Sequence, residues 1–155
     1  MLWACVLLPH LALDTVLRRH PCPDQPLALV TGPVQRRVLS AVNAAAAARG
    51  LHRGQSIAAA QALCGDLQAV DDDPARRARA RDFLAAWAYR YSSQVSTDIP
   101  GALLLEVQGS LGLFGPWPAF EARLRDDLAA LGFRHRIALA PNAAAAAVLA
   151  GCHDG

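Results

Sequence analysis

Cysteines and histidines are the residues of this chain best suited to metal binding or nucleophilic chemistry. None of them forms a CxxC pair or another Cys/His spacing typical of a metal site. Because no secretion signal precedes them, we expect reduced thiols, buried or partly buried, and a cytoplasmic protein. The residues concerned are Cys5, Cys22, Cys64 and Cys152, with His10, His20, His52, His135 and His153.

All fifteen basic residues are arginines, so no lysine is available to neutralise a triphosphate or to form a Schiff base. A net charge of +2 is too small to indicate nucleic-acid binding by itself. Two groups of arginines could nevertheless contact DNA phosphates, although plain solubility explains them equally well. They are Arg36, Arg37, Arg49 and Arg53, and further along the chain Arg134 and Arg136.

The length of 155 residues suits one compact domain, or a domain with an inserted lobe, and 54% hydrophobic residues can form a real core. No uninterrupted apolar stretch of about 18 residues occurs, which excludes a membrane-spanning helix. The apolar periodicity predicts strands and helices in turn. Strands are expected at 2–8, 27–31, 37–41, 95–97, 102–107 and 136–140, and helices at 11–19, 44–48, 56–63, from Pro74 onward, at 117–131 and at 143–150.

The order of these elements predicts an α+β fold. With residues 11–70 set aside, the remainder is strand, helix, strand, strand, helix, strand, which is the ferredoxin-like βαββαβ arrangement. Residues 1–10 and 71–155 would then form one domain, and 11–70 a small α/β lobe inserted after its first strand. Segment 109–115 is expected to be a glycine-punctuated loop. The apolar stripes of the two long helices should face the core. These stripes are Ala80, Phe83, Leu84, Trp87 and Tyr91, and Phe120, Leu124, Leu128 and Leu131.

Several strings, in order along nearly the whole chain, resemble segments of the Y-family, or translesion, DNA polymerases. In the inserted lobe, Ser40, Asn43, Gly50 and Gly54 fall in register with that family's fingers pattern. The resemblance implies a palm at 1–10 and 71–155 and fingers at 11–70, with thumb and little-finger domains absent. The strings are LLPHLALDTVLRR, PLALVTG, RRVLSAVNAAAAARGLHRGQSIAAAQALC, GALLLEVQGSLGLFG and RIALAPNAAAAAVLA.

The resemblance also implies where the family's chemistry should lie. Two-metal nucleotidyl transfer needs carboxylates on the first strand and at the start of the second palm hairpin. Those positions correspond here to Val6, Gly101 and Ala102, none of which can bind a cation. The triphosphate contacts of the family correspond to alanines, so we expect no catalytic residue, nucleotide site, metal or cofactor. These alanines are Ala41, Ala44, Ala47 and Ala143.

Within the family, the chain is most similar to the ImuB-type, catalytically inactive proteins of the bacterial mutasome. This similarity implies a non-catalytic scaffold in SOS-induced DNA repair, mutagenesis and error-prone translesion synthesis. The implied partners are DNA, a DnaE-type error-prone polymerase, a RecA-like accessory protein and the sliding clamp, mostly bound through a C-terminal region that is missing here.

Two other functions remain open. The first is an active DNA polymerase whose metal site has been displaced onto Asp14, Asp98 and Glu106. Asp14 lies within the helix at 11–19, and we expect it to face water or to pair with Arg18. The second is an unrelated ferredoxin-like module that binds nucleic acid. Such a module would need aromatic residues on an open sheet face, whereas Phe83, Trp87, Tyr91 and Phe120 are expected in the core.

Overall fold

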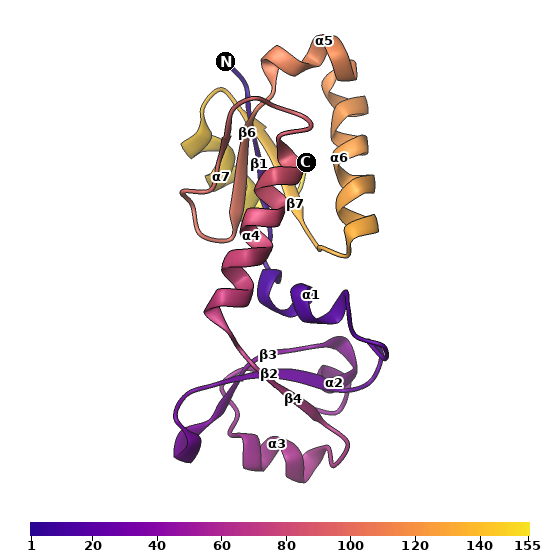
Figure 1. The fold of residues 1–155 in the computed structure, drawn as a ribbon, viewed down its shortest axis with the longest axis vertical. Coiled ribbons are helices and arrows are strands. Elements are labelled where there is room, and N and C mark those ends of the chain that lie inside the picture. The colour runs from indigo at the N-terminus through magenta and orange to yellow at the C-terminus, as the bar shows by residue number, and fades with distance from the viewer. The chain divides into compact units, whose positions relative to one another are not determined.

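The computed structural model describes residues 1–155, which form two compact units (Figure 1). The first unit combines Met1–Leu11 with Ala75–Gly155, and the second is Ala12–Pro74. The sequence expectation divides the chain after residues 10 and 70, whereas the units divide after Leu11 and Pro74. None of the helices combines the length and the apolar character that a membrane span requires.

The first unit is built on a four-stranded sheet with the order β5-β6-β1-β7. Every pair of neighbouring strands is antiparallel. This is the strand order of the split βαβ fold, so the predicted α+β, ferredoxin-like architecture is confirmed. The strands are β1 (Trp3–Leu7), β5 (Val95–Ser96), β6 (Ala102–Glu106) and β7 (Arg136–Ala140).

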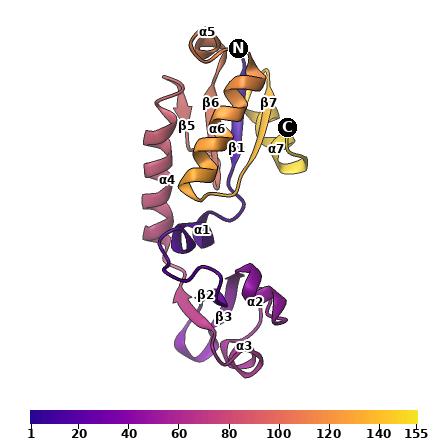
Figure 2. The same ribbon diagram turned by 90° about the vertical axis from the view of Figure 1, so that its right-hand side faces the viewer.

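Helices cover both faces of this sheet. The helices α4 (Pro74–Ala88) and α6 (Trp117–Leu131) share one core with it, while α7 (Ala143–Cys152) packs on the opposite face (Figure 2). Asn142 caps α7 by accepting a hydrogen bond from the Ala145 N–H at 2.8 Å, as its position before an alanine run predicts. Because both faces are covered, the sheet has no open face for the stacked bases that a nucleic-acid-binding module would need.

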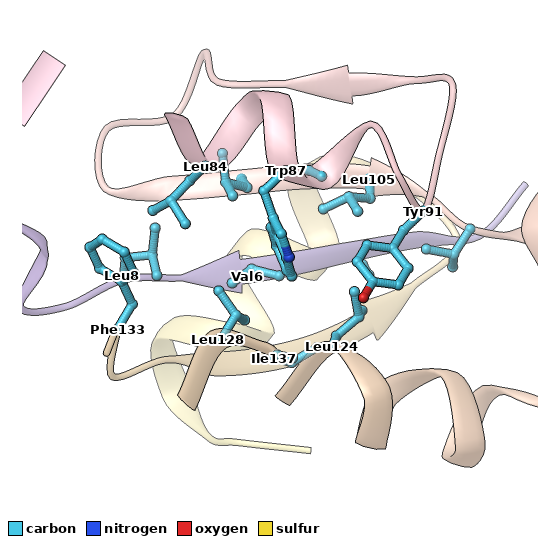
Figure 3. Packing of buried hydrophobic residues seen from close by; sticks show 14 of the residues in the cluster. Val6, Leu8, Leu84, Trp87, Tyr91, Leu105, Leu124, Leu128, Phe133 and Ile137 are labelled. Atoms are coloured by element: carbon cyan, nitrogen blue, oxygen red, sulfur yellow. The ribbon is translucent and has the colours of Figure 1, made fainter. Parts of the chain in front are cut away.

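The core between the sheet and the two long helices consists of large side chains (Figure 3). Phe120, Leu124 and Leu128 on α6 are fully buried, as their spacing predicts. Along α4 the buried stripe is Ala80, Leu84 and Trp87. The expectation that Phe83 belongs to this stripe is wrong, because it precedes Leu84 by about 100° of helical turn and is 45% exposed.

The segment 109–115 is not a loop. A 3₁₀ turn, η2 (Gln108–Ser110), leads directly into a short helix, α5 (Leu111–Phe114). The carboxylate of Glu106, which is only 8% exposed, organises this connection. It accepts hydrogen bonds from the N–H groups of Gln108 at 3.0 Å and of Gly109 and Leu2 at 3.4 Å. Backbone donors of this turn are thereby satisfied by a side chain.

The second unit has a three-stranded sheet with the order β3-β2-β4. The antiparallel pair β2–β3 is the hairpin predicted around Gly32-Pro33. At Gly32, φ is +99° and an added Cβ would lie 2.8 Å from the Arg36 carbonyl, so glycine is required. The elements are α1 (Leu11–Leu17), β2 (Leu27–Thr31), η1 (Val34–Arg36), β3 (Val38–Val42), α2 (Ala44–Ala48), α3 (Ile57–Leu63) and β4 (Gln68–Asp71).

Asn43 is the polar centre of the second unit. Its side-chain oxygen caps α2 by accepting from the Ala46 N–H at 2.9 Å and also accepts from the Leu27 N–H at 3.1 Å. Its amide nitrogen donates to the Gln25 carbonyl at 2.7 Å and the Pro23 carbonyl at 3.2 Å. The predicted cap therefore also fixes the proline-rich turn that precedes β2.

Two expectations about exposure are wrong. Asp14 does not face water, since only 3% of it is exposed, while the alternative of a pair with Arg18 stays a prediction. A helix of seven residues makes two turns, and so short a pattern does not define an outer face. Cys5 and Cys64 are buried, but Cys22 and Cys152 are exposed. Cys22 lies between two prolines in a turn, and Cys152 is the last residue of α7.

Candidate functional site

The positions matched to the family's metal-binding carboxylates lie at one end of the sheet, but on different faces. Gly101 occupies the turn into β6 with φ +73°, and Ala102 begins that strand. Ala102 is paired with Leu7, whereas Val6 is paired with Leu103. Val6 points into the core under α4 and α6, as Figure 3 shows.

Leu7 is therefore the β1 residue that shares a face with Ala102. Side chains alternate between the two faces of a strand. A shift of one residue therefore moves a side chain from the core under α4 and α6 to the face covered by α7. Leu7, Ala102 and Ile99 belong to one apolar cluster on that face. Leu7, and not Val6, therefore lies beside Ala102, and the side chains gathered at this end are hydrocarbon.

Ala143 lies at the other end of the sheet. It follows three residues after Ala140, which pairs with Trp3, while Leu7 pairs with Arg136. Four residues of strand separate these pairs by about 13 Å. The structure therefore does not bring Ala143 next to Ala102, because α7 starts at the far end and runs back along the sheet.

The end of α7 supplies the polar groups near Leu7 that the sequence reading missed. The Arg136 guanidinium donates to the Gly151 carbonyl at 3.4 Å. Asp154 accepts from the Ile137 N–H at 2.8 Å and forms a two-pronged ion pair with Arg125, at 2.7 and 3.1 Å. Hydrogen bonds from Arg125 and from the Ile137 N–H lower the pKa of Asp154. This carboxylate is thus committed to a structural contact.

The acids of the alternative metal site do not converge. Asp98 is exposed just before the turn at Gly101, and Glu106 ends the same strand that begins at Ala102. About 13 Å of strand therefore separates their regions, and the Glu106 carboxylate is occupied by three backbone N–H groups. Asp14 belongs to the second unit. The chain contains no group of three His, Cys, Asp or Glu residues that could hold a metal ion.

The three fingers positions matched to triphosphate contacts lie close together in the second unit. Ala44 and Ala47 are exposed on α2, and Ala41 is half-buried in β3. Their spacing of three residues puts Ala44 and Ala47 on the same side of the helix. Methyl groups can neither donate a hydrogen bond nor carry charge, so this surface offers nothing to a phosphate.

The six arginines proposed to contact phosphate differ in availability. Arg37 forms an ion pair with Asp71, and Arg49 one with Asp66 at 3.5 Å. Arg36 and Arg53 are exposed and have no ion pair. Both flank the outer edge of β3, because residues 54–57 pair with 37–39 through backbone hydrogen bonds. In the first unit, Arg134 and Arg136 are exposed at the start of β7.

A protein-family model and two curated relatives match the sequence of this chain. Residues 12–151 match the model of the impB/mucB/samB family. "Protein ImuB" of Caulobacter vibrioides, in strains NA1000 / CB15N and ATCC 19089 / CIP 103742 / CB 15, is 39% identical over 101 residues. These residues make up 65% of this chain and 22% of that protein. The chain therefore spans about a fifth of the length of these curated relatives.

Solved polymerase structures share the fold. Dbh DNA polymerase in a post-insertion binary complex matches with a TM-score of 0.78 and 14% identity, over 100% of this chain and 46% of that chain. DinB from Sulfolobus solfataricus matches with a TM-score of 0.69 and 16% identity, with the same coverage. Since the family model extends over most of its length, the chain belongs to the impB/mucB/samB family and has the fold of the Y-family DNA polymerases.

Proposed function

We propose that this chain is the palm and fingers region of a non-catalytic Y-family polymerase homologue that acts as a scaffold in SOS-induced, error-prone translesion synthesis. The observation that carries the proposal is the apolar end of the palm sheet, where Leu7, Gly101 and Ala102 stand close together without a carboxylate. Two-metal catalysis needs acidic ligands at that place. The alanines Ala44 and Ala47 in the fingers support the proposal from a separate segment.

Metal binding and primer extension test the loss of catalysis directly. We expect no extension of a primed DNA template with Mg²⁺ or Mn²⁺, and no saturable Mg²⁺ binding by calorimetry. A single Mg²⁺ site that disappears in Asp98→Asn or Glu106→Gln would favour the displaced metal site and an active DNA nucleotidyltransferase. Glu121→Gln, whose carboxylate accepts from Arg125 at 2.9 Å, is the matched control.

Restoring carboxylates tests whether Leu7 or Val6 corresponds to the family's metal-binding position on the first strand. The double variant Leu7→Asp, Ala102→Glu places two acids on the same face at paired positions, and should bind Mn²⁺ detectably by electron paramagnetic resonance. The variant Val6→Asp, Ala102→Glu places its acids on opposite faces and should gain no binding. Circular dichroism establishes that each variant is folded. Stronger Mn²⁺ binding by a folded Val6→Asp variant would show that the register is wrong.

The scaffold role is proposed for proteins of the length of the relatives, of which this chain spans about a fifth. The relative named "Protein ImuB" supports a place in the bacterial mutasome. Under this proposal the partners are a DnaE-type polymerase, a RecA-like accessory protein and the sliding clamp. Size-exclusion chromatography of purified partners with the chain would show which contacts belong to palm and fingers. If no partner co-elutes with the chain or its longer homologue, the scaffold role is wrong.

DNA contact is a second candidate function, supported by Arg36 and Arg53. Both side chains are exposed without an ion pair at one edge of the second unit. A salt-dependent gel-shift assay should show weaker DNA binding for Arg36→Ala and Arg53→Ala, because each lost phosphate contact removes an electrostatic term. Arg49→Ala, already paired with Asp66, serves as the control. Absence of binding at low salt would remove DNA from the partners of this chain.

A further inference from the structure

The strand β4 forms an open edge of the sheet in the second unit (Figure 1). The opposite edge of that sheet, β3, is bonded by the backbone of residues 54–57. In the first unit, the tail after α7 bonds to the outer edge of β7, because the Ile137 N–H donates to Asp154 and the Ile137 carbonyl accepts from Gly155, both at 2.8 Å. The edge strand β5 has two residues, whereas β4 has four. Among the longer edge strands, β4 is thus the one with no backbone segment paired on its outer side.

The outward backbone groups of β4 belong to Ala69. The Gln68 N–H donates to the Pro26 carbonyl at 3.0 Å, and the Asp72 N–H donates to the Val30 carbonyl at 2.9 Å. Alternate residues of a strand bond to the same neighbour, so Gln68 and Asp72 face β2, while the N–H and C=O of Ala69 point away from it. Ala69 is exposed. One donor and one acceptor are therefore presented side by side to solvent at the middle of the edge.

Such a pair of groups is what an added strand requires. Proteins usually shorten, cover or charge their edge strands, because an open edge pairs with other extended chains. An extended segment laid along β4 would exchange hydrogen bonds with Ala69 and extend the sheet from three strands to four. The backbone of Ala69 is sufficient for this pairing, and no side chain has to leave its present contacts.

The charges around the edge decide which extended chain fits. Asp66 precedes β4, and Asp72 follows it directly. A second copy paired antiparallel about Ala69 would place Asp72 opposite Asp66 of the other copy at both ends of the contact, and like charges in opposite positions are destabilising. Nucleic acid is unsuited for the same reason, because its phosphates are negative. A segment with uncharged or basic residues fits the edge best.

We propose that β4 docks an extended segment of a protein partner, which adds a strand to the second unit through the backbone of Ala69 and carries basic residues near its ends. Pairing of this kind takes its affinity from main-chain hydrogen bonds. The docking edge lies in the second unit, away from the end of the sheet where Leu7 and Ala102 lie, and does not depend on the loss of catalysis.

A synthetic peptide provides the probe. It has about nine residues, alternating threonine and valine with a lysine near each end, and is labelled for fluorescence anisotropy. We expect saturable binding to the chain, with slower hydrogen exchange of the Ala69 amide in the complex. Ala69→Pro removes the outward N–H without touching the β2–β4 hydrogen bonds, and should weaken binding roughly tenfold or more. Ala69→Val keeps the N–H and should bind as the wild type does.

Two modified peptides test the pairing without changing the chain. One carries N-methyl groups on its odd residues and the other on its even residues, so that one of them loses the N–H groups that face β4. We expect one peptide to bind and the other to fail. Equal binding of both, equal binding to Ala69→Pro, or no saturable binding of the parent peptide would overturn the proposal.

The self-association of the chain is measured in parallel. Sedimentation equilibrium should show a monomer at the concentrations of the titration. A dimer that dissociates in Ala69→Pro would mean that a second copy occupies the edge, which would contradict the partner proposed here. Circular dichroism establishes that each variant is folded, and if Ala69→Pro does not fold, the two N-methylated peptides decide the question on the wild-type chain.

Discussion

The two faces of the palm sheet are packed with side chains of very different size. Under α4 and α6 the core is made of leucines and aromatic rings, including Trp87, Tyr91 and Phe120. Under α7 the buried residues are mostly alanines, such as Ala138 and Ala146, together with Cys5 and Leu104. Both faces belong to the same sheet. The difference in size therefore lies in the helices that cover each face and in the strand residues that point toward it.

The contrast suggests that one face of the sheet stabilises the domain and that the other positions α7 relative to the sheet. Large rings bury the most apolar area and account for most of the hydrophobic stabilisation. Small side chains contribute little area, but they let the α7 backbone approach the sheet closely, and Leu7 and Ala102 belong to this face. We infer that the α4/α6 face holds the domain together, while the α7 face fixes the geometry at the end of the sheet where Leu7, Gly101 and Ala102 lie. The following predictions test that division.

Truncation on the α4/α6 face should have the largest effect. Phe120 is fully buried and stacks on Phe114, with ring centroids 4.9 Å apart. Phe120→Ala should lower the free energy of unfolding by about 3–5 kcal/mol, because the cavity adds to the lost apolar contact. Urea denaturation measures it. Val148→Ala, 67% exposed on α7, should change stability by less than about 0.5 kcal/mol. A loss below 1 kcal/mol for Phe120→Ala would contradict the division.

Enlargement on the α7 face should have the next largest effect. Ala146 is fully buried between α7 and the sheet. Ala146→Leu should lower the free energy of unfolding by about 1–3 kcal/mol, because a close-packed site must move to admit three more carbons. Ala144→Leu, at an exposed position of the same helix, should be nearly neutral. If Ala146→Leu were neutral as well, the α7 face would be loosely packed and its positioning role untenable.

Much of the fold could be predicted from local signals. The bounds of α6 and β7 agree with the apolar pattern, and Gly132, with φ +89°, ends α6 in the left-handed conformation. The strand β4 was missed because it is short and mostly exposed, and its partner β2 lies about forty residues earlier. The helix α5 was missed because the Glu106 carboxylate organises the turn before it, a contact that periodicity does not report.

The candidate site was less predictable for a physical reason. A strand buried on both faces reads as an almost continuous apolar run, so alternation does not show which residue faces which way. The first strand is such a run, so its sequence does not show that Leu7, and not Val6, lies beside Ala102. The helix α7 runs back along the sheet because it packs against β7. Gly151 and Asp154, and not Ala143, therefore lie at the end of the sheet that contains Leu7 and Ala102.

Glu106 tests whether the far end of the α7 face is rigid. It follows Ala102 and Leu104 on the same side of β6, and its carboxylate accepts three backbone N–H groups. Glu106→Gln replaces one acceptor oxygen by a donor, and should lower the free energy of unfolding by about 1–2 kcal/mol. Hydrogen exchange at Gln108 and Gly109 should accelerate. Asp98→Asn in the exposed turn should alter neither quantity, and an equal effect of both changes would exclude the proposed role of the carboxylate.

Cys5 tests the α7 face by titration. Burial raises the pKa of its thiol from 9.0 to about 11. Because the folded state favours the neutral thiol, its contribution to stability is complete below pH 9 and is lost as the pH rises through about 11. The melting temperature of the wild type, relative to Cys5→Ala, should therefore decline between pH 9 and 11. The exposed Cys152 should react with a thiol reagent at pH 8 long before Cys5 does. A melting-temperature difference that stays constant from pH 7 to 11, with equal labelling rates, would mean that the alanine-lined face admits water and is not close-packed.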